Sequence, residues 1–156
     1  MSHIHDAVDF TVEVFIVYQN IVFLRKHDKY KKWLGVGGHI EPKEDPAEAA
    51  LREVKEEVGL SVVLWSVPRV PDATGMYVEL PPPVFLNRHR INDRHEHVTM
   101  VYFATAPTCE IHPGEDEVSE EMRWFTVEEL HDPRFGIGET IAKYAGEALL
   151  KLGSTA

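Results

Sequence analysis

Cysteine is almost absent from this chain: Cys109 stands alone, so no disulfide can form within the chain. Basic residues are also few, 16 Lys and Arg against 26 Asp and Glu, which gives a formal net charge of −10. General nucleic-acid binding needs a basic surface, and this balance argues against it. No apolar run is long enough to span a membrane, and residues 1–6 lack the basic and apolar stretches of a signal peptide. We therefore expect no membrane partner and a cytoplasmic location.

The residues that are present have the composition of a globular protein. Hydrophobic residues make up 44% and charged residues 27% of the 156 positions. A chain of this length suits one core and is short for two. No repeat, low-complexity stretch or linker divides it. We therefore expect a single domain over residues 1–156, with residues 1–6 as a flexible tail.

The stretch from residue 38 to residue 60 carries the strongest pattern. Pro46 suits the first turn of a helix, where its missing N–H would have no partner, and Asp45 before it is a suitable N-cap. Gly59 is a suitable C-terminal stop. Between them, one apolar stripe recurs at three- and four-residue steps and predicts a helix: Ala47, Ala50, Leu51, Val54 and Val58.

Three glutamates share a different face of this predicted helix. Glu53, Glu56 and Glu57 stand at i, i+3 and i+4, a spacing at which like charges repel. Local rules broken in one place tend to mark function, and several carboxylates converging on one point suit a hard cation such as Mg²⁺. Taken alone, the three glutamates fit a solvated acidic helix face better than a metal site.

The complete spacing is more specific than the glutamates alone. Gly38 is followed by five residues, Glu44, seven residues and then the run Arg52–Leu60, REVKEEVGL. This resembles the Nudix box, G-x5-E-x7-R-E-U-x-E-E-x-G-U with U a bulky aliphatic residue, and all nine specified positions match. The resemblance implies an α/β (α+β) fold, an alpha/beta/alpha sandwich with a mixed sheet. It places the box helix on one face of that sheet and the C-terminal helix on the other.

The resemblance also implies an activity. Nudix enzymes are Mg²⁺-dependent hydrolases, with Mn²⁺ as an alternative ion, and they cleave a phosphoanhydride in a nucleoside diphosphate linked to another group. The small-molecule substrate classes left open are nucleoside triphosphates, dinucleoside polyphosphates and nucleotide sugars. Family members are often dimers, so a homodimer is one expected state. The implied metal ligands are Glu53, Glu56, Glu57 and the Gly38 carbonyl; Arg52 would orient the glutamates, and Glu44 would brace the loop or a metal-bound water.

A further carboxylate from outside the box is common in the family, as a metal ligand or general base. Glu117 and Glu120 are our first candidates, with Glu96 as a rival. The base is therefore either Glu53 or one of these outside carboxylates. His95 and His97 form a weak metal motif, because a strand places both on one face but supplies no third ligand.

Composition outside the box predicts short strands joined by polar segments. The basic run at residues 25–32 is predicted to be a loop that could hold phosphates, and residues 88–96 a polar connection between strands. A loop is predicted before Gly38. The remaining expected elements are strands at 8–17, 21–24, 61–67, 84–87, 98–106 and 122–125, loops at 68–83 and 107–121, and helices from residue 127 and over 137–152.

Two other functions fit the sequence less closely. One is a nucleotide-binding regulatory module that keeps the Nudix fold and does not turn its ligand over. The intact set of carboxylates argues against it. The other is a protein-interaction domain whose acidic helix binds a basic partner, which predicts salt-sensitive capture and no metal affinity.

Overall fold

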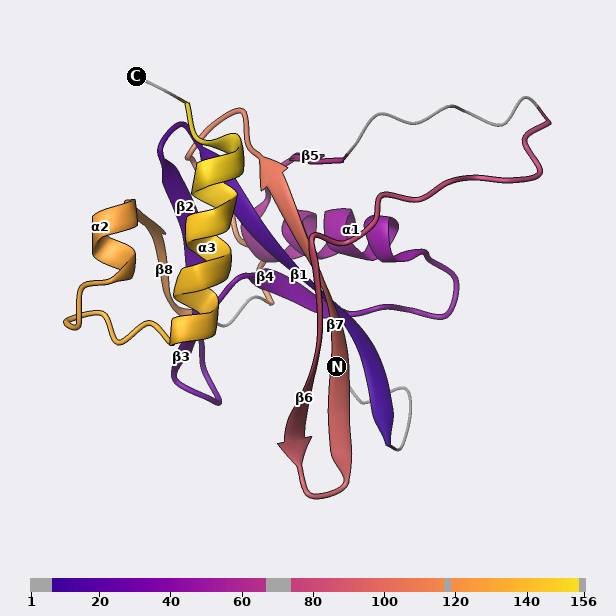
Figure 1. Ribbon diagram of the computed structural model, residues 1–156, viewed down its shortest axis with the longest axis horizontal. Helices are drawn as coiled ribbons and strands as arrows, with labels where there is room; N and C mark the ends of the chain where they lie inside the picture. The colour runs from indigo at the N-terminus through magenta and orange to yellow at the C-terminus, as the bar shows by residue number, and fades with distance from the viewer. Residues whose placement is uncertain (1–6, 67–73, 117–118, 155–156) are drawn as a thin grey trace.

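Two long parallel strands form the centre of the sheet in the computed structural model, which describes residues 7–66, 74–116 and 119–154. β1 (Val8–Tyr18) pairs with β7 (His95–Thr105) over ten consecutive positions (Figure 1). The other strands join this pair in antiparallel fashion. β4 (Val36–His39) and β2 (Ile21–His27) pair with β1, β3 (Lys32–Leu34) and β8 (Ser119–Phe125) pair with β2, and β5 (Val63–Leu64) and β6 (Phe85–Asn92) pair with β7.

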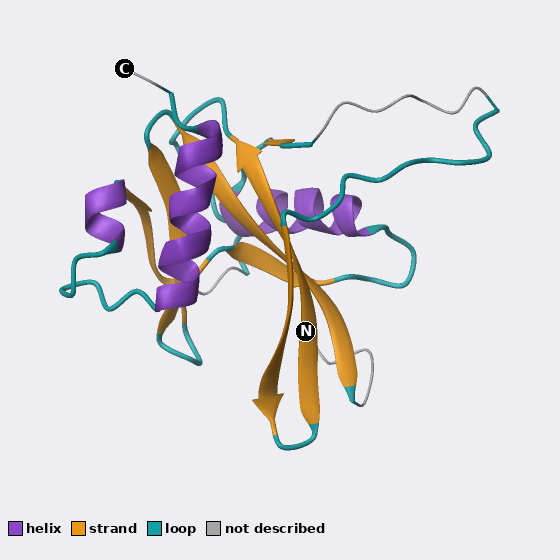
Figure 2. Ribbon diagram, in the orientation of Figure 1, coloured by secondary structure: helices purple, strands orange, loops and turns teal. Residues whose placement is uncertain are grey.

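Helices cover both faces of this mixed sheet (Figure 2). α1 (Pro46–Val58) lies on one face and α3 (Glu139–Leu152) on the other, with the short α2 (Val127–Leu130) beside α3. Alternate residues of β1 supply the two cores: Val14 packs with the apolar residues of α1, and Phe15 packs with those of α3. The predicted three-layer α+β architecture is confirmed.

The box helix begins and ends where its local signals predict. The Asp45 side chain accepts hydrogen bonds from the backbone N–H groups of Ala47 and Glu48, and the Glu48 side chain accepts one from the Asp45 N–H. This reciprocal capping box satisfies helix N–H groups that have no partner within the helix. Gly59 ends α1 with a φ of 70°, in the left-handed region that favours glycine. The helix is therefore held at both ends by short-range contacts.

Several strands extend further than the sequence predicts. Residues 25–27 belong to β2 and are not part of a loop, and residues 36–38 belong to β4. The polar segment 88–96 is not a connection, because β6 and β7 form a hairpin through it. Segment 88–96 can be polar because this end of the sheet projects beyond the helices, where no apolar layer covers the strands (Figure 1). β8 likewise begins at Ser119 inside the predicted loop, whereas the strand predicted at 61–67 shrinks to β5 and α3 starts at Glu139.

Some predictions fall on residues outside the described ranges. These are the tail at residues 1–6, the end of the strand predicted to reach residue 67, the first part of the loop 68–83, and Glu117. Among the described helices, none combines the length and the apolar character needed to cross a membrane.

Candidate active site

Arg52 of α1 contacts three glutamates and the backbone of β4. Its Nε and Nη2 donate to the two carboxylate oxygens of Glu44, at 3.0 and 2.7 Å. Its Nη1 donates to Glu53 Oε1 at 2.9 Å and to Glu56 Oε2 at 3.0 Å. Nη2 also donates to the backbone carbonyl of His39 at 3.0 Å. One guanidinium therefore fixes the start of α1 relative to the strand that precedes it.

Glu44 joins this contact to the loop between β4 and α1. Its Oε1 accepts a hydrogen bond from the backbone N–H of Glu41 at 2.9 Å. The hydrogen bonds from Arg52 hold the pKa of Glu44 below its usual range, and the Glu44 carboxylate in turn raises the pKa of Arg52 further. The pair is ionised at neutral pH, and Glu44 lies where it braces the loop.

Gly38 and Glu53 are in close contact across the boundary between β4 and α1. A Cβ atom at Gly38 would lie closer than 3.0 Å to Glu53 Oε1, so only glycine leaves room for this carboxylate. Glu53 is 6% exposed, and burial raises its pKa despite the neighbouring Arg52 guanidinium. A carboxylate with a raised pKa retains a proton to higher pH than an exposed glutamate does.

Glu57 faces a different cation, Arg25 of β2. Arg25 Nη2 lies 2.7 Å from Glu57 Oε1, and both side chains are 10% exposed. The backbone N–H of Gly37 donates to the other oxygen, Glu57 Oε2, at 3.1 Å. The structure thus gathers Glu44, Glu53 and Glu56 around Arg52, and it directs Glu57 toward β2.

Two residues of this region escaped the sequence prediction. Arg25 was grouped with a basic loop, although it follows the apolar run of a strand. Glu13 occupies an alternate position of the apolar strand β1, and its Oε1 accepts from the backbone N–H of Gly35 at 2.8 Å. Burial raises the pKa of Glu13, while the Gly35 hydrogen bond and the Arg25 charge oppose that rise. The sequence signal for Glu13 was a carboxylate placed between the apolar residues Val12 and Val14 of a predicted strand.

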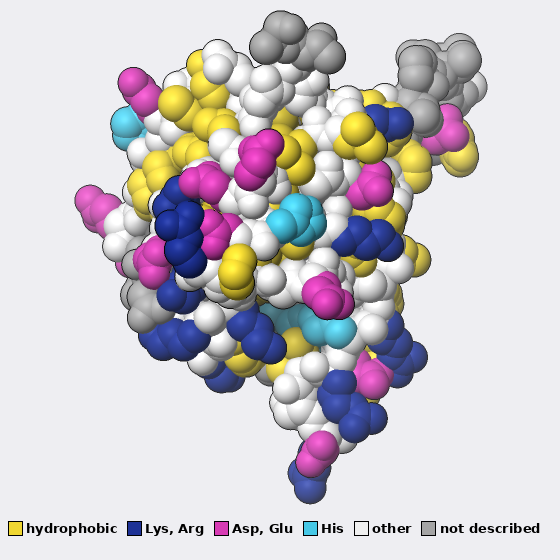
Figure 3. Space-filling model, turned by 60° about the vertical axis from the view of Figure 1, so that its left-hand side comes forward, with side chains coloured by type: hydrophobic (Ala, Val, Ile, Leu, Met, Phe, Trp, Pro, Cys, Tyr) yellow, Lys and Arg dark blue, Asp and Glu magenta, His cyan; other side chains and the backbone are white. Residues whose placement is uncertain are grey.

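The charges of this site suit a divalent cation. Among the residues that the structure describes, Glu44, Glu53, Glu56 and Glu57 form ion pairs with two guanidiniums, those of Arg52 and Arg25, so these carboxylates outnumber their guanidinium partners. Acidic and basic side chains also lie against one another on the face shown in Figure 3. Carboxylate oxygens are the donors that Mg²⁺ prefers, and the backbone of Gly38 approaches the Glu53 carboxylate closely. The donor set therefore fits a hard divalent ion.

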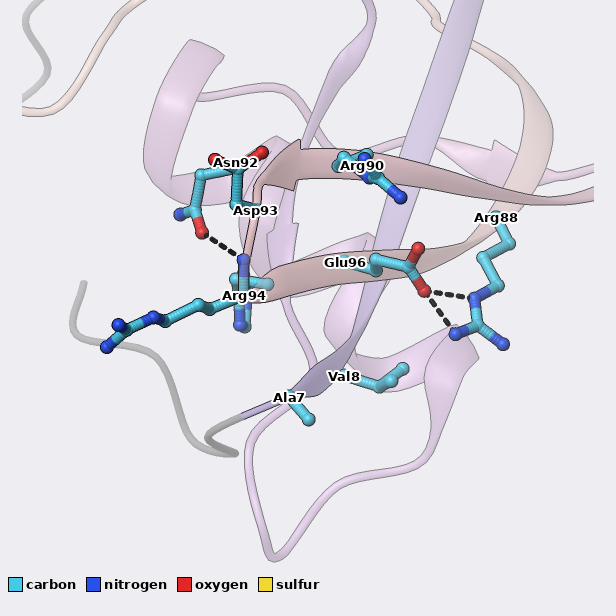
Figure 4. Close-up of a pocket in the computed structure, with 9 residues that line it drawn as sticks. Ala7, Val8, Arg88, Arg90, Asn92, Asp93, Arg94 and Glu96 are labelled. Carbon is cyan, nitrogen blue, oxygen red and sulfur yellow. Dashed lines mark hydrogen bonds and ion pairs between the residues drawn. The ribbon is translucent and has the colours of Figure 1, made fainter.

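The outside carboxylates lie in different places. Glu96 is on β7 and pairs with Arg88 of β6, in a pocket at the far end of the hairpin (Figure 4). Glu96 is therefore paired with Arg88 on the hairpin and is not among the glutamates that contact Arg52. Glu120 belongs to β8, the strand that pairs with β2 next to Arg25. Glu117 lies outside the described residues.

This chain is similar to known proteins in sequence and in fold. The family model of the NUDIX domain matches residues 9–144. A NUDIX-family hydrolase from Clostridium perfringens is 37% identical, covers 92% of this chain and 97% of that chain, and superposes with a TM-score of 0.78. An ADP-ribose pyrophosphatase from Streptococcus suis (18% identity, 95% and 94% coverage, TM-score 0.57) has the same fold. A UDP-X diphosphatase (15% identity, 94% and 65% coverage, TM-score 0.58) also has it.

Proposed function

Because this chain belongs to the Nudix hydrolase family, we propose that it hydrolyses a phosphoanhydride bond in a nucleoside diphosphate linked to another group, with Mg²⁺ as its ion. The observation that carries the proposal is the contact of Arg52 with Glu44, Glu53 and Glu56 at the start of α1. A helix held for stability alone would not place four acidic side chains around two guanidiniums.

The proposed ligands of the ion are Glu53, Glu56 and Glu57, with the Gly38 carbonyl as a further oxygen. When bound, the ion supplies positive charge that offsets the charge building up on the phosphate oxygens. Arg52 orients Glu53 and Glu56 through its two hydrogen bonds from Nη1. Arg25 does the same for Glu57.

The proton of the attacking water needs an acceptor. Within the box the candidate base is Glu53, and the alternative is a carboxylate from outside the box. Among the outside carboxylates, Glu120 is favoured over Glu96, because Glu96 already pairs with Arg88. Replacing Glu53 or Glu120 with glutamine and comparing the pH profiles of kcat distinguishes the two.

The substrate class follows from the diphosphate that these residues serve. Nucleoside triphosphates, dinucleoside polyphosphates and nucleotide sugars, a class to which UDP-linked compounds and ADP-ribose are related, all carry it. We propose that the exposed loop before β6 contributes to the choice among them, because its Met76, Tyr77 and Val78 side chains are largely exposed. Exposed aromatic and apolar side chains of this kind stack against bases or sugars.

A product screen tests the reaction. The purified protein is incubated with a panel of these compounds, with Mg²⁺ or with a chelator, and products are identified by mass. The expected result is Mg²⁺-dependent cleavage of one compound far above the others. Tight nucleotide binding without any product would instead support the binding-module function.

Glu56→Gln is the decisive variant. Glu56 has a side chain that is 59% exposed, so its loss leaves the fold intact, and turnover should fall by roughly 100-fold or more. Glu57→Gln is less clean, because it also removes the partner of the buried Arg25. Glu147→Gln, an exposed glutamate of α3, is the matched control and should keep wild-type turnover. Normal turnover in folded Glu56→Gln protein would overturn the assignment.

A further inference from the structure

A second group of side chains that could hold a metal ion lies next to His39. Asp9 of β1 and His95 and His97 of β7 each offer one donor atom, and these three atoms lie within 4.8 Å of one another. The parallel pairing of β1 with β7 creates this group, because it places Asp9 opposite His97. The spacing of the two histidines in the sequence supplies no third ligand. The third ligand is Asp9, which stands on another strand, 88 residues before His97. The next inward-facing pair on these strands, Thr11 and Thr99, is hydrogen-bonded across the same separation.

A fourth side chain adjoins the same carboxylate oxygen. His39 Nε2 lies 3.2 Å from Asp9 Oδ2, and His95 Nε2 lies 3.4 Å from it. The ring centroid of His97 is 5.0 Å from that of His39 and 5.1 Å from that of His95, in nearly perpendicular orientations. Three imidazoles from β4 and β7 thus surround one carboxylate.

The separation of His95 from Asp9 matches one edge of a tetrahedral metal site. Ligands about 2.1 Å from a zinc ion at tetrahedral angles stand about 3.4 Å from one another. His95 Nε2 lies 3.4 Å from Asp9 Oδ2, which is longer than an ordinary N–H···O hydrogen bond. The His39 contact, at 3.2 Å, is at the upper limit of such a bond.

Burial and donor type narrow the choice of ion. Asp9 is 1% exposed and His95 is 5% exposed, so the group is enclosed as in structural zinc sites. Imidazole nitrogen suits zinc and its transition-metal neighbours, whereas Mg²⁺ prefers oxygen donors.

We propose that Asp9, His95 and His97 hold a zinc-class transition-metal ion, separate from the carboxylate site on α1, with His39 adjoining the Asp9 carboxylate. His95 also lines the pocket between the start of β1 and the β6–β7 hairpin. Bound metal would link β1 and β7, the two central strands of the sheet.

Cobalt substitution tests the site without any mutation. Protein stripped with a chelator is supplied with excess Mg²⁺, which occupies oxygen-donor sites, and is then titrated with Co²⁺. Tetrahedral Co²⁺ gives intense visible absorption, whereas six-coordinate Co²⁺ at carboxylates absorbs weakly. We expect one equivalent of the intensely absorbing form, displaced by an equivalent of Zn²⁺. Weak absorption alone from folded protein would overturn the proposal and leave a hydrogen-bonded histidine–carboxylate core.

Variants identify the ligands by the same readout. His95→Ala and His97→Ala should each weaken Zn²⁺ affinity by at least about 100-fold, and Zn²⁺ should no longer raise their melting temperatures. His131→Ala, at an exposed histidine after α2, is the control and should bind like the wild type. Unchanged zinc affinity in folded His97→Ala protein would overturn the assignment. If an alanine variant does not fold, Asp9→Asn, which keeps the side-chain volume, replaces it in the comparison.

Discussion

Replacing Arg25 with methionine tests whether the buried ion pair between β2 and α1 is as costly to break as its burial suggests. Methionine retains much of the arginine stem but removes the charge, so Glu57 would remain 8% exposed without its cation. Removing one partner of a buried pair costs about 3–5 kcal/mol. The hydrogen bond from the Gly37 N–H to Glu57 Oε2 remains, so we expect the lower end, about 3 kcal/mol.

The next residue along β2 supplies a matched control. Lys26 Nζ lies 3.0 Å from Glu121 Oε1, but these side chains are 26% and 56% exposed. Exposed pairs contribute about 0–1 kcal/mol, so Lys26→Met should change stability by less than about 1 kcal/mol. Both variants have the same new side chain on the same strand, and they differ in the burial of the pair that is lost.

Urea unfolding measures both variants by linear extrapolation, and thermal unfolding provides a second estimate. A loss of about 3 kcal/mol in a chain of this size lowers the melting temperature by roughly 6–12 °C. The double variant Arg25→Met with Glu57→Gln should recover part of the loss, since it leaves no unpaired charge. If Arg25→Met costs no more than Lys26→Met, burial does not govern this pair and the reasoning is refuted.

Three further stability predictions follow from the backbone and the caps. Gly37→Ala should destabilise the protein by about 1–3 kcal/mol in urea, because the new Cβ would lie closer than 3.0 Å to the Val12 carbonyl oxygen; an unchanged midpoint would contradict this. Gly146→Ala, in the interior of α3 with nothing within 4 Å of the new Cβ, should stabilise it by about 0.5–1 kcal/mol, and a lower melting temperature would argue against that packing. Asp45→Ala removes the capping box of α1 and should cost about 1 kcal/mol, with Asp45→Asn as the control that keeps most of the stability.

The sequence predicted the elements whose signals are local. The bounds of α1 follow from Asp45, Pro46 and Gly59, which act within one turn of the helix that they delimit. The capping box opening α2 at Thr126 was found for the same reason. The inner halves of β6 and β7 were predicted, and the outer half of this hairpin was missed, because a polar strand at the projecting end of a sheet looks like a loop.

In the candidate site, too, the contacts between residues close in sequence could be predicted, and those between distant elements could not. Arg52, Glu44, Glu53 and Glu56 lie close in sequence, and one helix with its preceding loop brings them together. Arg25 could not be assigned to Glu57 from the sequence, because their contact depends on how β2 packs beneath α1. The histidines of β7 depend in turn on the parallel register with β1, and residue spacing carries no information about register between distant strands.

The parallel pairing of β1 with β7 has a consequence for how the chain is made. β1 is synthesised well before its central partner β7, which ends at Thr105, 87 residues after the last residue of β1. Until then, among the described strands, β1 has β2 and β4 as neighbours, and both cores lack the residues of β7. Such long-range pairings form slowly, because a large loop must close before they contribute. An N-terminal fragment that ends after Leu60 contains the complete motif but lacks β7. The nascent chain therefore contains all the residues of the motif before the sheet that positions them can form.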